Sequence, residues 1–195
     1  PTGDVRLFIH GENLWASVIS KNAKSLSFQK VSLTTPTSSS IDAIPISFEA
    51  NVEGMDEEEA IVASDWDWVH IDDFPEKNCP QFIQSFNPLT IVSVNLTTGR
   101  VNLVGRSKTV MANSAHAMRG GTNFVQHPAK PNAFIGIVSH MDSRKLTVKI
   151  GFTTSRVVEV SYVNGEWSMT SISEPFRLPT ISNSTSANRT ARPFT

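Results

Sequence analysis

The feature that most constrains this chain is the spacing of its apolar residues, which recur at every second position in short runs separated by turn residues. Alternation of this kind sends successive side chains to opposite faces of a β-strand, whereas an amphipathic helix needs a period of 3.6 residues. No stretch longer than about a dozen residues keeps the helical period. The sequence therefore predicts an all-β protein built of short strands.

Three hairpins are predicted from this pattern. Residues 5–9 alternate, a turn follows at 11–13, and residues 14–19 return. Residues 90–96 and 101–104 flank a second turn, and residues 157–163 and 167–172 flank the dipeptide Asn164-Gly165, which suits the left-handed conformations of a type I′ turn. Residues 44–52 also alternate, and Pro45 within them indicates an edge strand or a strand start.

The remaining segments define the expected boundaries. Residues 34–40 are polar and contain Pro36, and residues 53–59 are acidic, so both are predicted to be solvated loops. From residue 179 onward Ser, Thr, Asn, Arg and Pro dominate, which is typical of a flexible tail. We expect one domain over residues 1–178 and a tail over 179–195. A first residue that is Pro1 rather than methionine, followed at once by a strand, indicates a piece of a longer reading frame.

Charge and composition exclude several classes of function. The chain has 195 residues, 17 Lys plus Arg against 18 Asp plus Glu, and a formal charge of -1, which lacks the basic surface that a nucleic-acid partner requires. It contains neither a membrane-spanning apolar run nor a signal peptide. Cys79 is the single cysteine, and the five histidines show no zinc-site spacing, so neither a disulfide nor a metal site is predicted. The sequons at Asn95, Asn183 and Asn188 permit glycosylation if the protein enters the secretory pathway, and the compartment stays open.

Three separated segments carry a resemblance to a known group of proteins. The first runs Asp4-Val5-Arg6-Leu7-Phe8-Ile9-His10 and continues through a turn to Leu14-Trp15. The second runs Glu76-Lys77-Asn78-Cys79-Pro80 and continues to Phe82 and Phe86-Asn87-Pro88. The third runs Arg119-Gly120-Gly121-Thr122, then an apolar strand ending in Ser139-His140, then Ile172-Ser173-Glu174-Pro175-Phe176.

In their order and spacing, these segments resemble the blade starts of five-bladed β-propeller carbohydrate-active proteins, namely the mannoside phosphorylases and hydrolases of glycoside hydrolase family 130. The resemblance spans about residues 3–178 and implies a five-bladed β-propeller. This chain would supply about three of the blades, because a four-stranded blade takes roughly fifty residues. The chain departs from the family pattern at Gly3, where an acid is usual, at Val5, which replaces a proline, and at Cys79, which replaces an aromatic residue.

The resemblance also implies a site, in which residues from different blade starts converge. Asp4 would be a catalytic carboxyl group, and the substrate would be bound by Arg6, Lys77, Asn78, Arg119, Gly120 and His140, with no metal and no cofactor. Asp, Asn and Arg suit the vicinal hydroxyl groups of a sugar. If phosphate is the acceptor, Arg6, Lys77, Arg119 and His140 would form its cationic clamp.

Each of these residues also has a structural interpretation. Asp4 and Arg6 would form a buried pair between strands, the two glycines would turn a corner, and His140 would be a hydrogen-bonded residue at a strand end. A second carboxylate, which glycosidic cleavage requires, would come from one of five residues between which the sequence does not choose: Asp65, Asp67, Asp72, Asp73 or Glu174. In the segment Asp65-Trp66-Asp67-Trp68, the tryptophans would either form a sugar platform or pack in the core.

Three functions follow as hypotheses. The first is a carbohydrate-active propeller acting on mannose-like glycans, as an inverting glycosidase, a phosphorylase or a glycosyltransferase. The second is a propeller that binds glycans or serves as a scaffold without catalysis, which the substitutions at Gly3, Val5 and Cys79 permit. The third is a structural β-domain without a sugar site.

Overall fold

The computed structural model describes residues 4–20, 25–31, 43–45, 47–48, 68–72, 79–107, 118–141 and 153–177. Within these ranges the chain forms strands, turns and bends and contains no helix, so the all-β prediction is confirmed. The strands form three separate sheets, none of which closes on itself within the described ranges. The predicted loops at 34–40 and 53–59 and the predicted tail at 179–195 lie outside the described residues.

The first sheet, sheet A, is an antiparallel meander in the order β1-β2-β3-β4. Its first turn contains Gly11 at φ 60°, a left-handed conformation that glycine adopts without steric cost, and this confirms the predicted hairpin. Pro45 lies in the edge strand β4, as its missing N–H requires. The strands are β1 (Asp4–His10), β2 (Asn13–Ser20), β3 (Ser25–Val31) and β4 (Ala43–Pro45).

The second sheet, sheet B, has the order β5-β9-β8-β7-β6, in which β5 is parallel to β9 and the other pairs are antiparallel. The hairpin of β8 and β9 was predicted from the sequence. Asn95 sets its turn by accepting hydrogen bonds from the backbone N–H groups of Thr97 and Thr98 at 2.9 and 3.0 Å. The strands are β5 (Ser47–Phe48), β6 (Val69–Ile71), β7 (Gln81–Phe86), β8 (Leu89–Val94) and β9 (Arg100–Arg106).

The third sheet, sheet C, has the order β10-β12-β13-β14, with the short β11 also paired to β12. Asn164 and Gly165 have φ values of 53° and 84°, so both residues of the predicted type I′ turn are left-handed. The strands are β10 (Met118–Gly121), β11 (Val125–Gln126), β12 (Ala133–Met141), β13 (Thr153–Val163) and β14 (Glu166–Ile172).

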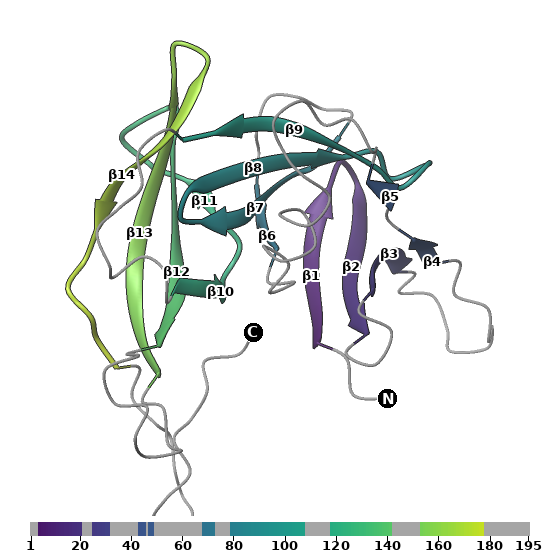
Figure 1. The fold of residues 1–195 in the computed structure, drawn as a ribbon, viewed down its shortest axis with the longest axis horizontal. Coiled ribbons are helices and arrows are strands. Elements are labelled where there is room, and N and C mark those ends of the chain that lie inside the picture. The colour runs from purple at the N-terminus through teal and green to yellow at the C-terminus, as the bar shows by residue number, and fades with distance from the viewer. Residues whose placement is uncertain are drawn as a thin grey trace, which may run out of the picture.

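Sheet B lies between the other two, and the three sheets follow one another around an arch (Figure 1). One core cluster joins sheets A and B through aromatic residues such as Phe8, Phe28 and Phe82. The other joins sheets B and C through Ile83, Ile91 and Val158, among others. In β8, Leu89 and Ile91 belong to the cluster with sheet C, Val92 and Val94 belong to the cluster with sheet A, and all six residues are buried. Both faces of β8, in the middle sheet, are therefore covered.

In sheet B the strands β6 to β9 form a four-stranded meander, and β5 is added to it beside β9. The first strands of the meanders in sheets A, B and C, namely β1, β6 and β10, meet on the inner side of the arch. The segment after β10 pairs with β6, because the N–H of Phe124 donates to the carbonyl of His70 at 2.8 Å and the N–H of Asp72 donates to the carbonyl of Phe124 at 2.7 Å. The side chain of Asn123 reaches β1 and donates to the carbonyl of Leu7 at 3.1 Å. Backbone hydrogen bonds and one side chain thus hold three strands together that are far apart in the sequence.

Candidate functional site: the junction of the first strands

The place where β1, β6 and β10 meet gathers polar side chains from segments more than a hundred residues apart. We call this place the junction and define it by Arg6, Phe8, His10, His70, Asp72, Gly120 and Gly121. Arg6 and Phe8 are buried while their neighbours Val5 and Leu7 are exposed, so the alternation of β1 directs the arginine and the phenylalanine inward.

Arg6 connects sheet A to sheet C. Its guanidinium lies against the backbone of β10, and Nη1 donates to the carbonyl of Gly121 at 3.4 Å, a long hydrogen bond. A β-carbon at residue 120 would lie 2.5 Å from Nη1 and 2.6 Å from Cζ of Arg6, too close for either pair of atoms. The absence of a side chain at Gly120 is therefore what admits the buried arginine.

Gly121 serves a similar purpose for the backbone of sheet C. A β-carbon there would overlap the carbonyl of Ile137 on β12, and the register of β10 against β12 shifts between Arg119 and Gly121. The shift makes Gly120 the extra residue of a β-bulge, a feature that is common beside functional sites. The sequence left two interpretations open for these glycines, close approach of the backbone to a ligand or a simple corner, and the atoms that lie close to them in the structure belong to Arg6 and to β12 of this chain.

His70 is the most enclosed ionisable group of the junction. Its Nδ1 lies 2.5 Å from Oδ1 of Asp72, and its ring lies 4.6 Å from the ring of Phe8 and 5.3 Å from that of Phe82, measured between centroids. The imidazole is buried, whereas the Asp72 side chain keeps 28% of its surface exposed. The contact with Asp72 fixes the orientation of the imidazole, and the Asp72 side chain stays partly exposed to solvent.

His10 ends β1 on the same side. Burial lowers the pKa of His10 below its ordinary value of 6.5, and the charge of His70 lowers it further. The side chain is half-buried. At neutral pH a histidine of lowered pKa is predominantly uncharged, so one ring nitrogen of His10 can accept a hydrogen bond.

The structure brings together some of the residues that the resemblance implied. Arg6 and Gly120 are in direct contact, and Arg119 and His140 lie on neighbouring strands, where Arg119 pairs with Ser139 and His140 with Met118. His140 is next to the last residue of β12, as predicted. Asp4 begins β1 and pairs with Ile19. The side chains of Asp4, Arg119 and His140 and all of Lys77 and Asn78 lie outside the described part of the structure.

Sequence reasoning missed His10 and His70 as members of this site. Asp72 was one of five candidate carboxylates, and the structure places it beside His70. No local pattern identifies His70, because it lies between two apolar residues in a strand of three and its ring contacts come from β1 and β7. Trp68 is buried, so the core interpretation holds for that tryptophan, while Asp65, Trp66 and Asp67 lie outside the described residues.

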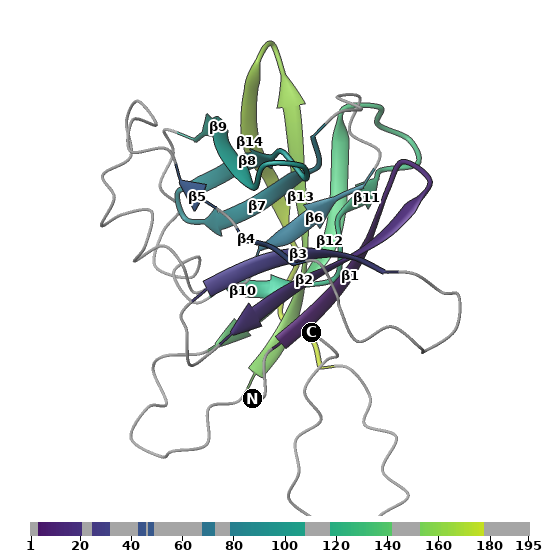
Figure 2. The same ribbon diagram turned by 90° about the vertical axis from the view of Figure 1, so that its right-hand side faces the viewer.

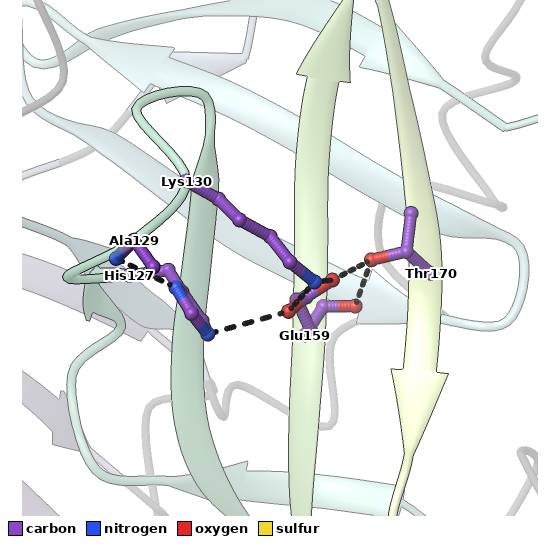
Figure 3. A network of polar contacts seen from close by, with 5 residues as sticks. All are labelled: His127, Ala129, Lys130, Glu159 and Thr170. Atoms are coloured by element: carbon purple, nitrogen blue, oxygen red, sulfur yellow. Dashed lines mark hydrogen bonds and ion pairs between the residues drawn. The ribbon is translucent and has the colours of Figure 1, made fainter.

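A second polar cluster lies away from the junction, on the outer face of sheet C (Figure 3). Lys130 Nζ donates to both carboxylate oxygens of Glu159 at 3.0 and 2.8 Å, the hydroxyl of Thr170 donates to Oε1 at 2.7 Å, and Nε2 of His127 lies 3.9 Å from Oε2. The hydrogen bonds from Lys130 and Thr170, together with the charges of Lys130 and His127, hold the pKa of Glu159 below its ordinary value of 4.5. The cluster ties the 127–132 loop to β13 and β14.

Two further features of the described ranges concern metal ligands and membrane-spanning helices. Among these residues, no three His, Cys, Asp or Glu side chains are grouped as metal ligands. Likewise, the described segments include no helix with the length and apolar character needed to cross a membrane. Comparisons with protein-family models, curated proteins and solved structures find no match to this chain.

Proposed function

We propose that the three sheets are successive blades of a β-propeller and that the junction is the sugar-binding part of a carbohydrate-active protein that handles mannose-like glycans. The observation that carries the proposal is the meeting of β1, β6 and β10, because it gathers Arg6, His70 with Asp72, and the Gly120-Gly121 pair from three separate sheets. In a propeller, the first strands of the blades surround the central channel, where dispersed residues form one site.

The arrangement of the sheets supports the propeller. Sheets A and B contain the four-stranded meanders β1–β4 and β6–β9, and the path β10-β12-β13-β14 of sheet C omits the short β11, which pairs with β12. Adjacent sheets pack face to face through apolar side chains. The chain order A, B, C is also the spatial order (Figure 1). A five-bladed ring, which the resemblance implies, would extend the same packing to two more blades.

The chemistry of the junction supports a polyhydroxylated ligand. Asp72 offers a partly exposed carboxylate and His10 a half-buried neutral imidazole, and both hydrogen-bond to hydroxyl groups. Arg6 is a buried cation in the same strand as His10. We expect Asp72 and His10 to contact the sugar directly and Arg6 to set the local positive potential, joined by Lys77, Asn78, Arg119 and His140 from the flanking segments.

Binding without catalysis is the second candidate, and one observation favours it. Glycosidic cleavage by the usual route needs two carboxyl groups on either side of the scissile bond. Among the junction side chains that the structure describes, Asp72 is the carboxylate, and it is engaged with His70. A catalytic reaction would require Asp4 as its partner.

Calorimetry and a turnover assay on the same protein distinguish these outcomes. We expect manno-oligosaccharides to bind, and Asp72→Asn to weaken binding by about tenfold, since a hydrogen bond to a charged group contributes roughly 1.5 kcal/mol. Lys130→Met, which changes the cluster on sheet C instead, should bind as the wild type does. Release of sugar or consumption of phosphate that Asp4→Asn abolishes would establish the enzyme. Binding without turnover would establish the second candidate, and the absence of binding would refute both.

A further inference from the structure

The hairpin of β13 and β14 ends in a turn that projects beyond the body of the protein, as Figure 1 and Figure 2 both show. The turn consists of Asn164 and Gly165, which lie between the paired residues Val163 and Glu166. We call Asn164 and Gly165 the hairpin tip. All four residues are exposed. Water therefore reaches the side-chain amide of Asn164 and the peptide bond that follows it.

An asparagine followed by glycine carries both reactants of an intramolecular reaction. The backbone nitrogen of the glycine attacks Cγ of the asparagine, a five-membered succinimide ring forms, and the side-chain nitrogen leaves as ammonia. Water then opens the ring at one of its two carbonyl groups, which gives either aspartate or isoaspartate. The new oxygen comes from water, so no other reactant is needed. Because the two groups belong to adjacent residues, the attack does not depend on an encounter in solution.

The hairpin tip leaves the attacking nitrogen free. In a two-residue hairpin turn, the backbone hydrogen bonds join the residues on either side, which here are Val163 and Glu166. Within the described ranges, neither the N–H of Gly165 nor the side-chain amide of Asn164 takes part in a hydrogen bond. A β-carbon at residue 165 would meet no atom within 4 Å, so the nitrogen is also not shielded by neighbouring groups.

Asparagines elsewhere in the described ranges differ from Asn164 in this respect. After Asn123, the N–H of Phe124 donates to the carbonyl of His70 at 2.8 Å, so the corresponding nitrogen is engaged. The side-chain oxygen of Asn95 accepts hydrogen bonds from two backbone N–H groups of its own turn, which hold Cγ in place. The hairpin tip is therefore distinguished by its structure as well as by its sequence.

We propose that Asn164 is a site of spontaneous chemical modification, at which the folded protein releases ammonia and converts to a mixture of aspartate and isoaspartate. The proposal is independent of the sugar-binding function, because the reaction uses only the two residues of the hairpin tip and water.

The two products affect the hairpin differently. Aspartate tolerates the left-handed conformation, and it changes the formal charge of the chain from -1 to -2. Isoaspartate adds a methylene group to the main chain, so a turn of two residues no longer fits between the paired strands. The adjacent pair consists of Tyr162 and Trp167, whose rings lie 5.3 Å apart between centroids. Trp167 also belongs to the core cluster of sheets B and C, so the isoaspartate form should loosen the start of β14.

Peptide mapping by mass spectrometry of the 195-residue protein, incubated at mildly alkaline pH, tests the proposal. Each conversion replaces NH₂ by OH and adds about 1 Da. We expect Asn164 to convert at least about tenfold faster than Asn123, because freeing the N–H of Phe124 breaks a hydrogen bond. The rate should lie within about tenfold of that in a synthetic peptide of residues 160–168, since opening the hairpin tip breaks few contacts.

Asn164→Gly is the matched variant, because glycine keeps the left-handed conformation and removes the amide. It should abolish the fast mass gain, and circular dichroism should show that the fold is retained. Equal conversion at Asn164 and Asn123 would overturn the proposal, as would a folded protein that stays intact while the peptide converts. In the isoaspartate form, isolated by ion-exchange chromatography, the amides of Tyr162 and Trp167 should exchange hydrogen faster than in the aspartate form. Equal exchange would refute the expected loss of pairing.

Discussion

Replacing Gly120 by alanine tests whether the junction is a tightly packed contact between sheets A and C. The added β-carbon would overlap the guanidinium of Arg6, which is buried and cannot swing into solvent without leaving β10. The φ angle of Gly120 lies outside the left-handed region, so alanine meets no backbone strain there. The three atoms nearest to the added β-carbon all belong to Arg6, so the cost of Gly120→Ala reports mainly on that side chain.

The magnitude follows from the contacts. Displacing Arg6 breaks the hydrogen bond that its guanidinium donates to the carbonyl of Gly121. Losing a hydrogen bond of a buried charged group costs about 2–4 kcal/mol. Alanine returns about 0.5–1 kcal/mol relative to glycine, because glycine loses more conformational freedom on folding. We expect the free energy of unfolding to fall by about 2 kcal/mol, or roughly 4–8 °C in Tm for a chain of this size.

A double-mutant cycle with Arg6→Met isolates the contact. With the guanidinium absent, Gly120→Ala should cost less than about 0.5 kcal/mol, because a methionine side chain adapts to the added methyl group. Urea unfolding followed by tryptophan fluorescence gives the four free energies, since the chain has four tryptophans.

Gly11→Ala is the control for this cycle. Gly11 has φ 60° and no atom near its missing β-carbon, so its cost of about 1 kcal/mol should be the same in both backgrounds. If Gly120→Ala costs as much in the Arg6→Met background as in the wild type, the packing of the guanidinium against Gly120 is refuted.

Two further predictions concern ionisation. The lowered pKa of Glu159 means that the carboxylate stabilises the fold above its ordinary value of 4.5 and that this stability is lost as the pH falls through the lowered value. The difference in unfolding free energy between the wild type and Lys130→Met should thus be largest above about pH 5 and should shrink on acidification. It should not exceed about 1 kcal/mol, because Lys130 is exposed. A difference that grows toward pH 3 would contradict the assignment. The lowered pKa of His10 means that folding opposes its protonation, so stability falls as the pH drops below 6.5. In an NMR titration His10 should have a midpoint below 6.5. His70→Phe should raise that midpoint but leave it below 6.5, since burial is the larger cause of the lowered pKa. An unchanged midpoint would exclude His70 as a contributor.

The sequence predicted best those parts of the fold that local chemistry determines. Asn164-Gly165 identified its hairpin because both residues adopt left-handed conformations, and the alternation of residues 5–9 identified β1. β6 and β10 escaped prediction because they have three and four residues, too few to establish a period, and because their pairing partners come from other segments of the chain.

For the candidate site too, the sequence indicated some residues but not the contacts between them. Arg6 and Gly120 were both named from sequence motifs, but their contact could not be derived from either motif, because it depends on how sheet A approaches sheet C across 114 positions of sequence. His70 was missed because a histidine between apolar residues is indistinguishable from a core residue until Asp72, Phe8 and Phe82 are seen around it. Long-range packing, which no local pattern encodes, decided which polar residues meet.

The central claim is that β1, β6 and β10 jointly form one sugar-binding site, and an amide NMR titration with a manno-oligosaccharide tests it most directly. We predict that shifts will concentrate at His10, Asp72, Gly120, Gly121 and Asn123, with Gly165 at the far hairpin as an unaffected reference. Shifts confined to a single sheet, or the same small shift at Gly165 as at Gly120, would contradict it.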